Sequence, residues 1–136
     1  MKRVLLCFSL LALLLLAACG GSSGPVKIDS ITLSKGDGSG NAGDTAVTSF
    51  SPADHDFHAA VKFENLATGV KVTFTWVAVN AGGATNKTIQ AIDVNAALAN
   101  EADSDLTLPN DWPTGQYRLD VSVNGDVLQS VSFNVA

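Results

Sequence analysis

Cysteine and histidine are scarce in this sequence of 136 residues, and each scarcity excludes a class of protein. The only cysteines are Cys7 and Cys19, so residues 20–136 cannot form a disulfide within a domain, and hydrophobic packing must hold that domain together. The only histidines, His55 and His58, lie in neither a G-x-S-x-G nor an H-E-x-x-H motif, and no pair of carboxylates has a recognisable catalytic spacing. We therefore expect no enzyme and no cofactor.

Basic residues are also few, with 8 lysines and arginines against 13 acidic residues. Lys2 and Arg3 stand at the amino terminus, and removal of residues 1–18 would lower the cations from 8 to 6 and change the net charge from −5 to −7. A chain this acidic is repelled by nucleic acid and by anionic lipid headgroups, so neither is an expected ligand.

Long apolar runs are limited to one, which extends from Val4 to Leu16. It is too short to cross a bilayer, because a membrane-spanning helix needs about 20 apolar residues. The run follows the two cations and is followed by the small residues Ala17 and Ala18, an arrangement typical of a cleaved export signal. The sequence therefore predicts a signal peptide over residues 1–18.

The segment Leu16-Ala17-Ala18-Cys19 resembles the lipobox of bacterial lipoproteins. The resemblance implies that Cys19 receives a diacylglycerol group, that a peptidase cuts before it, and that the freed amine is acylated as well. Two or more acyl chains hold a protein durably on a membrane. Because Gly20 rather than aspartate follows, the resemblance also implies the cell envelope, and the outer membrane in a Gram-negative cell. An ordinary secretory signal with an incidental Cys19 is the alternative.

The composition changes after the predicted cleavage point. Residues 19–26 begin with the cysteine and are then rich in glycine and serine, which is typical of a flexible tether. Residues 27–136 form one domain in which apolar residues recur at every second position, the period of a half-buried β-strand. The alternation is clearest over residues 70–80 and 117–123, and it places Trp76 in the core.

The remaining elements are shorter. We expect further strands at 27–35, 45–50, 57–64, 87–94 and 105–108, and a final strand that ends near residue 135. The alanine-rich segment 95–102 favours a short connector helix.

The turn before the final strand can be tested by its register. A two-residue turn at Asn124-Gly125 would send the apolar residues near the end of the chain to the wet face. A three-residue loop with a glycine bulge keeps them on the core side of the sheet, so we predict this loop. The residues then expected on the side of Tyr117, Leu119 and Val121 are Val127, Val131, Phe133 and Val135.

Short strands with frequent turns and little helix predict an all-β fold, a single antiparallel β-sandwich of seven or eight strands. The segment from Pro113 to Leu119 contains Gly115-Gln116-Tyr117, which resembles the tyrosine corner of immunoglobulin-like domains. Trp76, on the third main strand, stands where such domains place a core tryptophan, and Leu119 stands where antibody domains place a disulfide-bonded cysteine. The resemblance implies an immunoglobulin-like sandwich over residues 27–136.

Three groups of residues are candidates for binding. His55, Asp56 and His58 combine imidazole with carboxylate, a set suited to zinc or copper. Neighbouring side chains on one face of a strand are about 7 Å apart, however, which is too far for adjacent pairs to chelate an ion without a turn. The simpler interpretation is the solvated start of a strand. We therefore expect no metal.

The other two groups are a loop and a tryptophan. The loop from Asp37 to Asp44 alternates oxygen ligands with glycine but lacks the glycine and glutamate positions of an EF-hand, so an irregular calcium site and an ordinary loop both stay open. Trp112 is either an exposed platform for a sugar or peptide or part of the core.

These observations favour a lipid-anchored binding or interaction module of the cell envelope. Its partners would be the membrane, through the lipid on Cys19, and an envelope protein, peptide or glycan. A structural or accessory subunit of an envelope complex is the second hypothesis, and a small hydrolase is the third.

Overall fold

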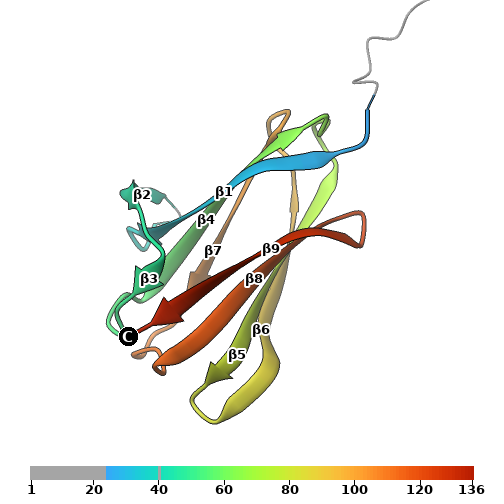
Figure 1. The fold of residues 1–136 in the computed structure, drawn as a ribbon. Coiled ribbons are helices and arrows are strands. Elements are labelled where there is room, and N and C mark those ends of the chain that lie inside the picture. Colours follow the sequence, from blue (N-terminus) through green and yellow to red (C-terminus); the bar gives the residue numbers. More distant parts are fainter. Residues whose placement is uncertain (1–23, 40) are drawn as a thin grey trace, which may run out of the picture.

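The computed structural model describes residues 24–39 and 41–136, which form two β-sheets packed face to face (Figure 1). The first sheet has the order β2-β1-β4-β7 and is built from Ala42–Ala46, Lys27–Gly36, Asp56–Glu64 and Glu101–Thr107. The second has the order β3-β9-β8-β5-β6 and is built from Ser49–Phe50, Asp126–Val135, Gly115–Val123, Lys71–Ala81 and Ala84–Asn95. The predicted all-β sandwich is confirmed. The described residues form nine strands because the strand expected at 45–50 is divided into β2 and β3, and β3 pairs in parallel with β9.

The predicted helix over residues 95–102 is wrong. Strand β6 continues to Asn95 and β7 begins at Glu101, with an isolated bridge between Leu98 and Glu101. Asn100 adopts a φ of 64° and its backbone exchanges hydrogen bonds with the Phe63 to Leu66 segment, so contacts between segments override the helical propensity of alanine. The described part of the chain contains no helix that is long and apolar enough to cross a membrane.

The core lies between the sheets and consists of the side chains that the period of two places on their inner faces. Trp76, Phe74 and Leu119 are completely buried, and Trp76 contacts Phe133 edge to face with a ring separation of 6.0 Å. The prediction that Trp76 belongs to the core is confirmed. Further rings extend this cluster toward the Gly115 end of β8, namely Phe50, Phe57, Trp112 and Tyr117.

The final hairpin has the two-residue turn that the sequence analysis rejected, and its bulge lies within the strands rather than in the loop. Asn124 and Gly125 form a two-residue turn with φ angles of 51° and 96°, so the predicted three-residue loop is wrong. The register then shifts, because Ser122 faces Val127 while Val121 faces Gln129. This bulge returns the rest of β9 to the core register, so Phe133, Val131 and Val135 lie opposite Tyr117, Leu119 and Gly115, whereas Val127 lies on the outer face and is 60% exposed.

The tyrosine corner that the sequence resembles is present in the structure. The Tyr117 hydroxyl donates a hydrogen bond of 2.6 Å to the carbonyl of Pro113. Tyr117→Phe should lower the free energy of unfolding by about 1 kcal/mol, because it leaves a partly buried carbonyl without its donor. Urea unfolding measures this loss. The control is Ser130→Ala, which removes an exposed hydrogen bond to Asp120, and an equally small loss in both variants would contradict the expectation.

The two ends of the sandwich carry different parts of the chain. Residues 24–27 lie at one end, and the turn between β5 and β6 lies at the other, near the carboxyl terminus (Figure 1). Ala136 is tied to that far end by a backbone hydrogen bond to Phe50. The chain therefore enters the domain at the end opposite the turn at Gly82 and Gly83.

Candidate functional site

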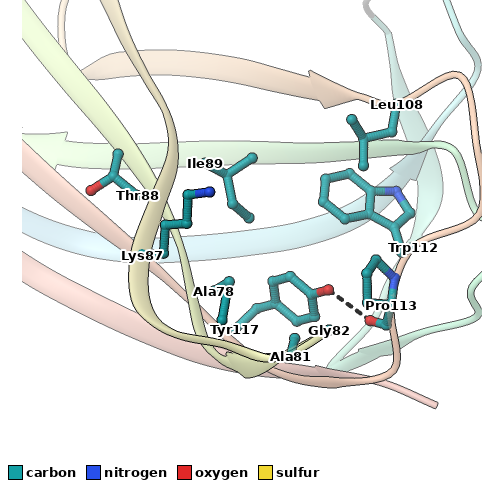
Figure 2. Close-up of a pocket in the computed structure, with 11 residues that line it drawn as sticks. Ala78, Ala81, Gly82, Lys87, Thr88, Ile89, Leu108, Trp112, Pro113 and Tyr117 are labelled. Atoms are coloured by element: carbon teal, nitrogen blue, oxygen red, sulfur yellow. Dashed lines mark hydrogen bonds between the residues drawn. The ribbon is translucent and has the colours of Figure 1, made fainter.

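The open side of the sandwich holds an apolar groove of about 330 Å³ (Figure 2). Strand β6 is the last strand of one sheet and β7 the last strand of the other, so no described strand closes the layers between them. The groove lies at the end of this opening that carries the β5–β6 turn. Its walls include Lys87 and Ile89 from β6, Leu108 after β7, Trp112, and Tyr117 from β8.

Aromatic packing fixes one wall of the groove. Trp112 stacks on Phe57 with ring centroids 4.4 Å apart and meets Tyr117 edge to face at 5.9 Å. Its backbone N–H donates a hydrogen bond to the Pro52 carbonyl, which attaches the 108–114 segment to the loop between β3 and β4. Figure 2 shows the six-membered ring of Trp112 directed toward Ile89 across the groove. This wall is therefore part of the core and needs no ligand to order it.

Of the two interpretations of Trp112, packing in the core is confirmed, because the residue is only 3% exposed, and an exposed platform is excluded. Tyr117 is also buried, and that burial raises the pKa of its hydroxyl above the usual value. Lys87 is therefore the one charged side chain among the described residues that line the groove. The groove combines apolar walls with a single cation at its rim.

The loop that begins at Asp37 uses its carboxylate internally. The two oxygens of Asp37 accept hydrogen bonds from the Asn41 side chain at 2.9 Å, from the Ser39 N–H at 2.8 Å and from the Asn41 N–H at 3.3 Å. These bonds lower the pKa of Asp37, with the Asn41 side chain contributing most. Asp44 belongs to β2, and its side chain lies outside the part that the structure describes. The hydrogen bonds at Asp37 are those of a self-contained turn.

The three residues that the sequence analysis weighed as metal ligands, His55, Asp56 and His58, interact with different partners. His55 contacts Asp111 at 2.9 Å near the protein surface. Asp56 accepts hydrogen bonds from the Gly38 N–H at 2.8 Å and from the Thr107 hydroxyl at 3.1 Å. Its carboxylate lies where a side chain at residue 36 would be, which requires glycine there. The set of His55, Asp56 and His58 therefore does not act together.

His58 lies instead against β7, where its Nδ1 atom is 2.6 Å from a carboxylate oxygen of Asp105. Sequence reasoning missed Asp103 and Asp105, although their alternation with Ala102, Ser104 and Leu106 is a strand signal. It also missed the groove, whose signal is the apolar residue Ile89 on a strand that becomes a sheet edge. Cys19, the predicted lipidation site, lies outside the described residues.

The comparisons with known proteins identify the fold. No family model matches the sequence, and no curated protein matches it. Among solved structures, the chain is similar to an immunoglobulin-like protein from Pseudomonas aeruginosa, with a TM-score of 0.58 and 18% identity over 85% of this chain and 100% of that chain. The chain therefore has the immunoglobulin-like β-sandwich fold, and this likeness says nothing further about its activity.

Weaker similarities involve parts of larger proteins. The alkylpurine DNA glycosylase AlkC from Pseudomonas fluorescens, bound to DNA, matches with a TM-score of 0.47 and 17% identity over 81% of this chain and 30% of that chain. A GH3 beta-glucosidase from Bifidobacterium adolescentis matches with a TM-score of 0.43 and 15% identity over 82% of this chain and 17% of that chain. The chain spans less than a third of either protein.

Proposed function

We propose that this chain is a lipid-anchored binding module of the bacterial cell envelope that holds an extended peptide segment of a partner protein in the groove beside Trp112. The observation that carries the proposal is the groove itself, an apolar hollow of about 330 Å³ between the edge strand β6 and the segment that follows β7. Its volume lies in the range of small-ligand sites. The anchor rests on the lipobox-like segment that ends at Cys19.

An extended peptide fits this site better than a sugar or a folded surface does. Strand β6 has β5 on one side and no described strand on the other, so its outer edge presents backbone donors and acceptors that a peptide strand can pair with. Alternate side chains of such a peptide would point into the groove between Ile89 and Leu108. Lys87 at the rim favours an acidic side chain beside an apolar one in the bound peptide.

Catalysis is not part of the proposal. The described residues that line the groove include two ionisable side chains, Lys87 and Tyr117, and burial raises the pKa of Tyr117. Such a pair offers a bound peptide no carboxylate and no imidazole for acid–base chemistry. The groove also lies at the end of the sandwich away from residue 24, where a tether would leave it accessible to a partner.

Site-specific crosslinking in cells tests the proposal. A photoreactive amino acid in place of Lys87 should crosslink one partner protein, whereas the same group in place of Ser130, an exposed residue of β9, should not. Ile89→Asp, combined with the crosslinker at position 87, should reduce the yield at least about tenfold, because it places a carboxylate in an apolar hollow. Mass spectrometry should then locate the crosslink in one peptide of the partner, and that peptide should bind the purified chain.

Two results would contradict the proposal. One is the same set of crosslinked proteins from positions 87 and 130, which would indicate nonspecific contact. The other is an unchanged yield with Ile89→Asp in a chain whose circular dichroism spectrum matches that of the wild type.

A further inference from the structure

A second cluster lies on the outer face of the other sheet and contains one imidazole and two carboxylates. His58 on β4 and Asp103 and Asp105 on β7 each offer a ligand atom, and these three atoms lie within 4.8 Å of one another. The register produces this arrangement, because His58 lies directly opposite Asp105 and Ala60 lies opposite Asp103. Asp103 and Asp105 are two residues apart on one strand and therefore share a face.

The strand pairing resolves the spacing problem that the sequence presents. Neighbours along one face of a strand are too far apart to share an ion, but directly opposite residues on paired strands have Cβ atoms about 5 Å apart, and diagonal neighbours are within reach of long side chains. His58 is opposite one carboxylate and diagonal to the other. The small side chain of Ala60 beside Asp103 leaves that diagonal open.

The surroundings hold the imidazole in place while one side of the cluster stays accessible. The side chain of His58 is 5% exposed and that of Asp105 is 25% exposed, whereas Asp103 lies on the surface. The Nδ1 atom of His58 is 2.6 Å from the Asp105 carboxylate, so the imidazole is already oriented toward the cluster. Asp56, two residues before His58, is occupied by Gly38 and Thr107 and takes no part.

We propose that His58, Asp103 and Asp105 bind a divalent transition-metal ion of the zinc class. One imidazole and two carboxylates suit zinc and its neighbours better than calcium or magnesium, which prefer oxygen ligands alone. The two carboxylates also neutralise the charge of the ion. Three protein ligands leave a further coordination position on the exposed side, which water or a group from a partner can occupy.

Binding requires a small movement of side chains only. Ligand atoms at about 2.1 Å from a tetrahedral ion are about 3.4 Å apart. The His58 nitrogen and the Asp105 oxygen must therefore separate by about 0.8 Å from their present 2.6 Å to admit the ion.

Titration of the purified full-length chain with Zn²⁺ tests the site. The chain is kept in detergent, carries no histidine tag, and is studied by isothermal titration calorimetry, with Co²⁺ absorption as a report on coordination geometry. We expect one saturable site per chain. His58→Gln should weaken binding at least about 100-fold and Asp103→Asn at least about tenfold, since even residues that only support metal ligands cost 10- to 100-fold.

The other histidine provides a matched control. His55 also contacts one carboxylate, that of Asp111 at 2.9 Å, but it has no second carboxylate in a ligand cluster. His55→Gln should therefore leave Zn²⁺ affinity unchanged. Asp103→Asn guards against misfolding, because Asp103 is exposed and takes no part in the bond between His58 and Asp105.

Thermal unfolding supplies a second readout. Zn²⁺ at about 100 times its Kd should raise the Tm of the wild type by about 10 °C. In Asp103→Asn the Tm without metal should equal that of the wild type, and the rise at the same Zn²⁺ concentration should fall to about half or less. The proposal is overturned if the wild type shows no saturable binding, or if His55→Gln weakens binding as much as His58→Gln does.

Discussion

Trp76→Ala is expected to lower the free energy of unfolding by about 3 to 5 kcal/mol, the cost of replacing a fully buried tryptophan and leaving a cavity. Trp76 lies on the interior strand β5, between β8 and β6, and packs edge to face against Phe133 of β9, two strands away in the same sheet. With no disulfide available to residues 20–136, this loss is a large part of the stability of an ordinary domain. Urea unfolding followed by circular dichroism measures the change.

A second variant at Trp76 and a control at an exposed residue show how much of the loss comes from the cavity. The indole nitrogen of Trp76 is buried and has no hydrogen-bond partner among the described residues, so Trp76→Phe should cost clearly less than Trp76→Ala. Leu98→Ala is the control, because Leu98 is 62% exposed and its truncation should change the stability by less than about 0.5 kcal/mol. A loss for Trp76→Ala as small as that for Leu98→Ala would remove Trp76 from the core.

Cys19→Ser is expected to abolish lipid attachment and to move the protein out of the membrane fraction or leave it as an uncleaved precursor. The thiol of Cys19 is the proposed acceptor of the lipid, and a hydroxyl does not replace it. Because the anchor would hold two or more acyl chains, its loss should change the distribution of the protein almost completely. Labelling cells with a clickable fatty acid, followed by fractionation, measures both effects.

The chain contains its own control for this experiment. Cys7 is the only other cysteine and lies within the predicted signal peptide, so Cys7→Ser should leave the labelling and the membrane location intact. Equal labelling of wild type and Cys19→Ser would refute the proposed anchor. Loss of labelling in both variants would show that the leader rather than the lipobox cysteine was affected.

The central strands were predictable because burial on one face dictates their sequence. Residues 70–80 and 117–123 alternate apolar and polar side chains, and they became β5 and β8 with ends displaced by a residue or two. The conformation of the segment 95–102 was not predictable from helical propensity. Asn100 accepts hydrogen bonds from the backbone of Phe63 and Leu66 and donates one to Leu66, and both residues are more than 30 positions away in the sequence. Helical propensity does not determine the backbone conformation where hydrogen bonds to distant segments are stronger.

The binding residues were only partly predictable for the same reason. The sequence identified His58 as a candidate ligand but assigned it neighbours along the chain, whereas its partners Asp103 and Asp105 come from a strand that pairs with β4. Trp112 was identified as important, yet whether its ring packs inward or faces solvent depends on Phe57 and Tyr117. Register and packing between distant segments therefore determine what these residues can do.

Residue 24 and the groove lie at opposite ends of the sandwich, and this arrangement determines how far from the membrane the groove of the anchored protein can lie. Strand β5 has 11 residues and is about 36 Å long at 3.3 Å per residue, and the tether that the sequence predicts would span at most about 25 Å if fully extended. Together these two lengths would allow the groove of the proposed lipoprotein to reach any point within about 60 Å of its lipid anchor. A partner anchored in the same membrane must present its peptide within that distance. Shortening the tether should first prevent binding of partners whose peptide lies farthest from the membrane.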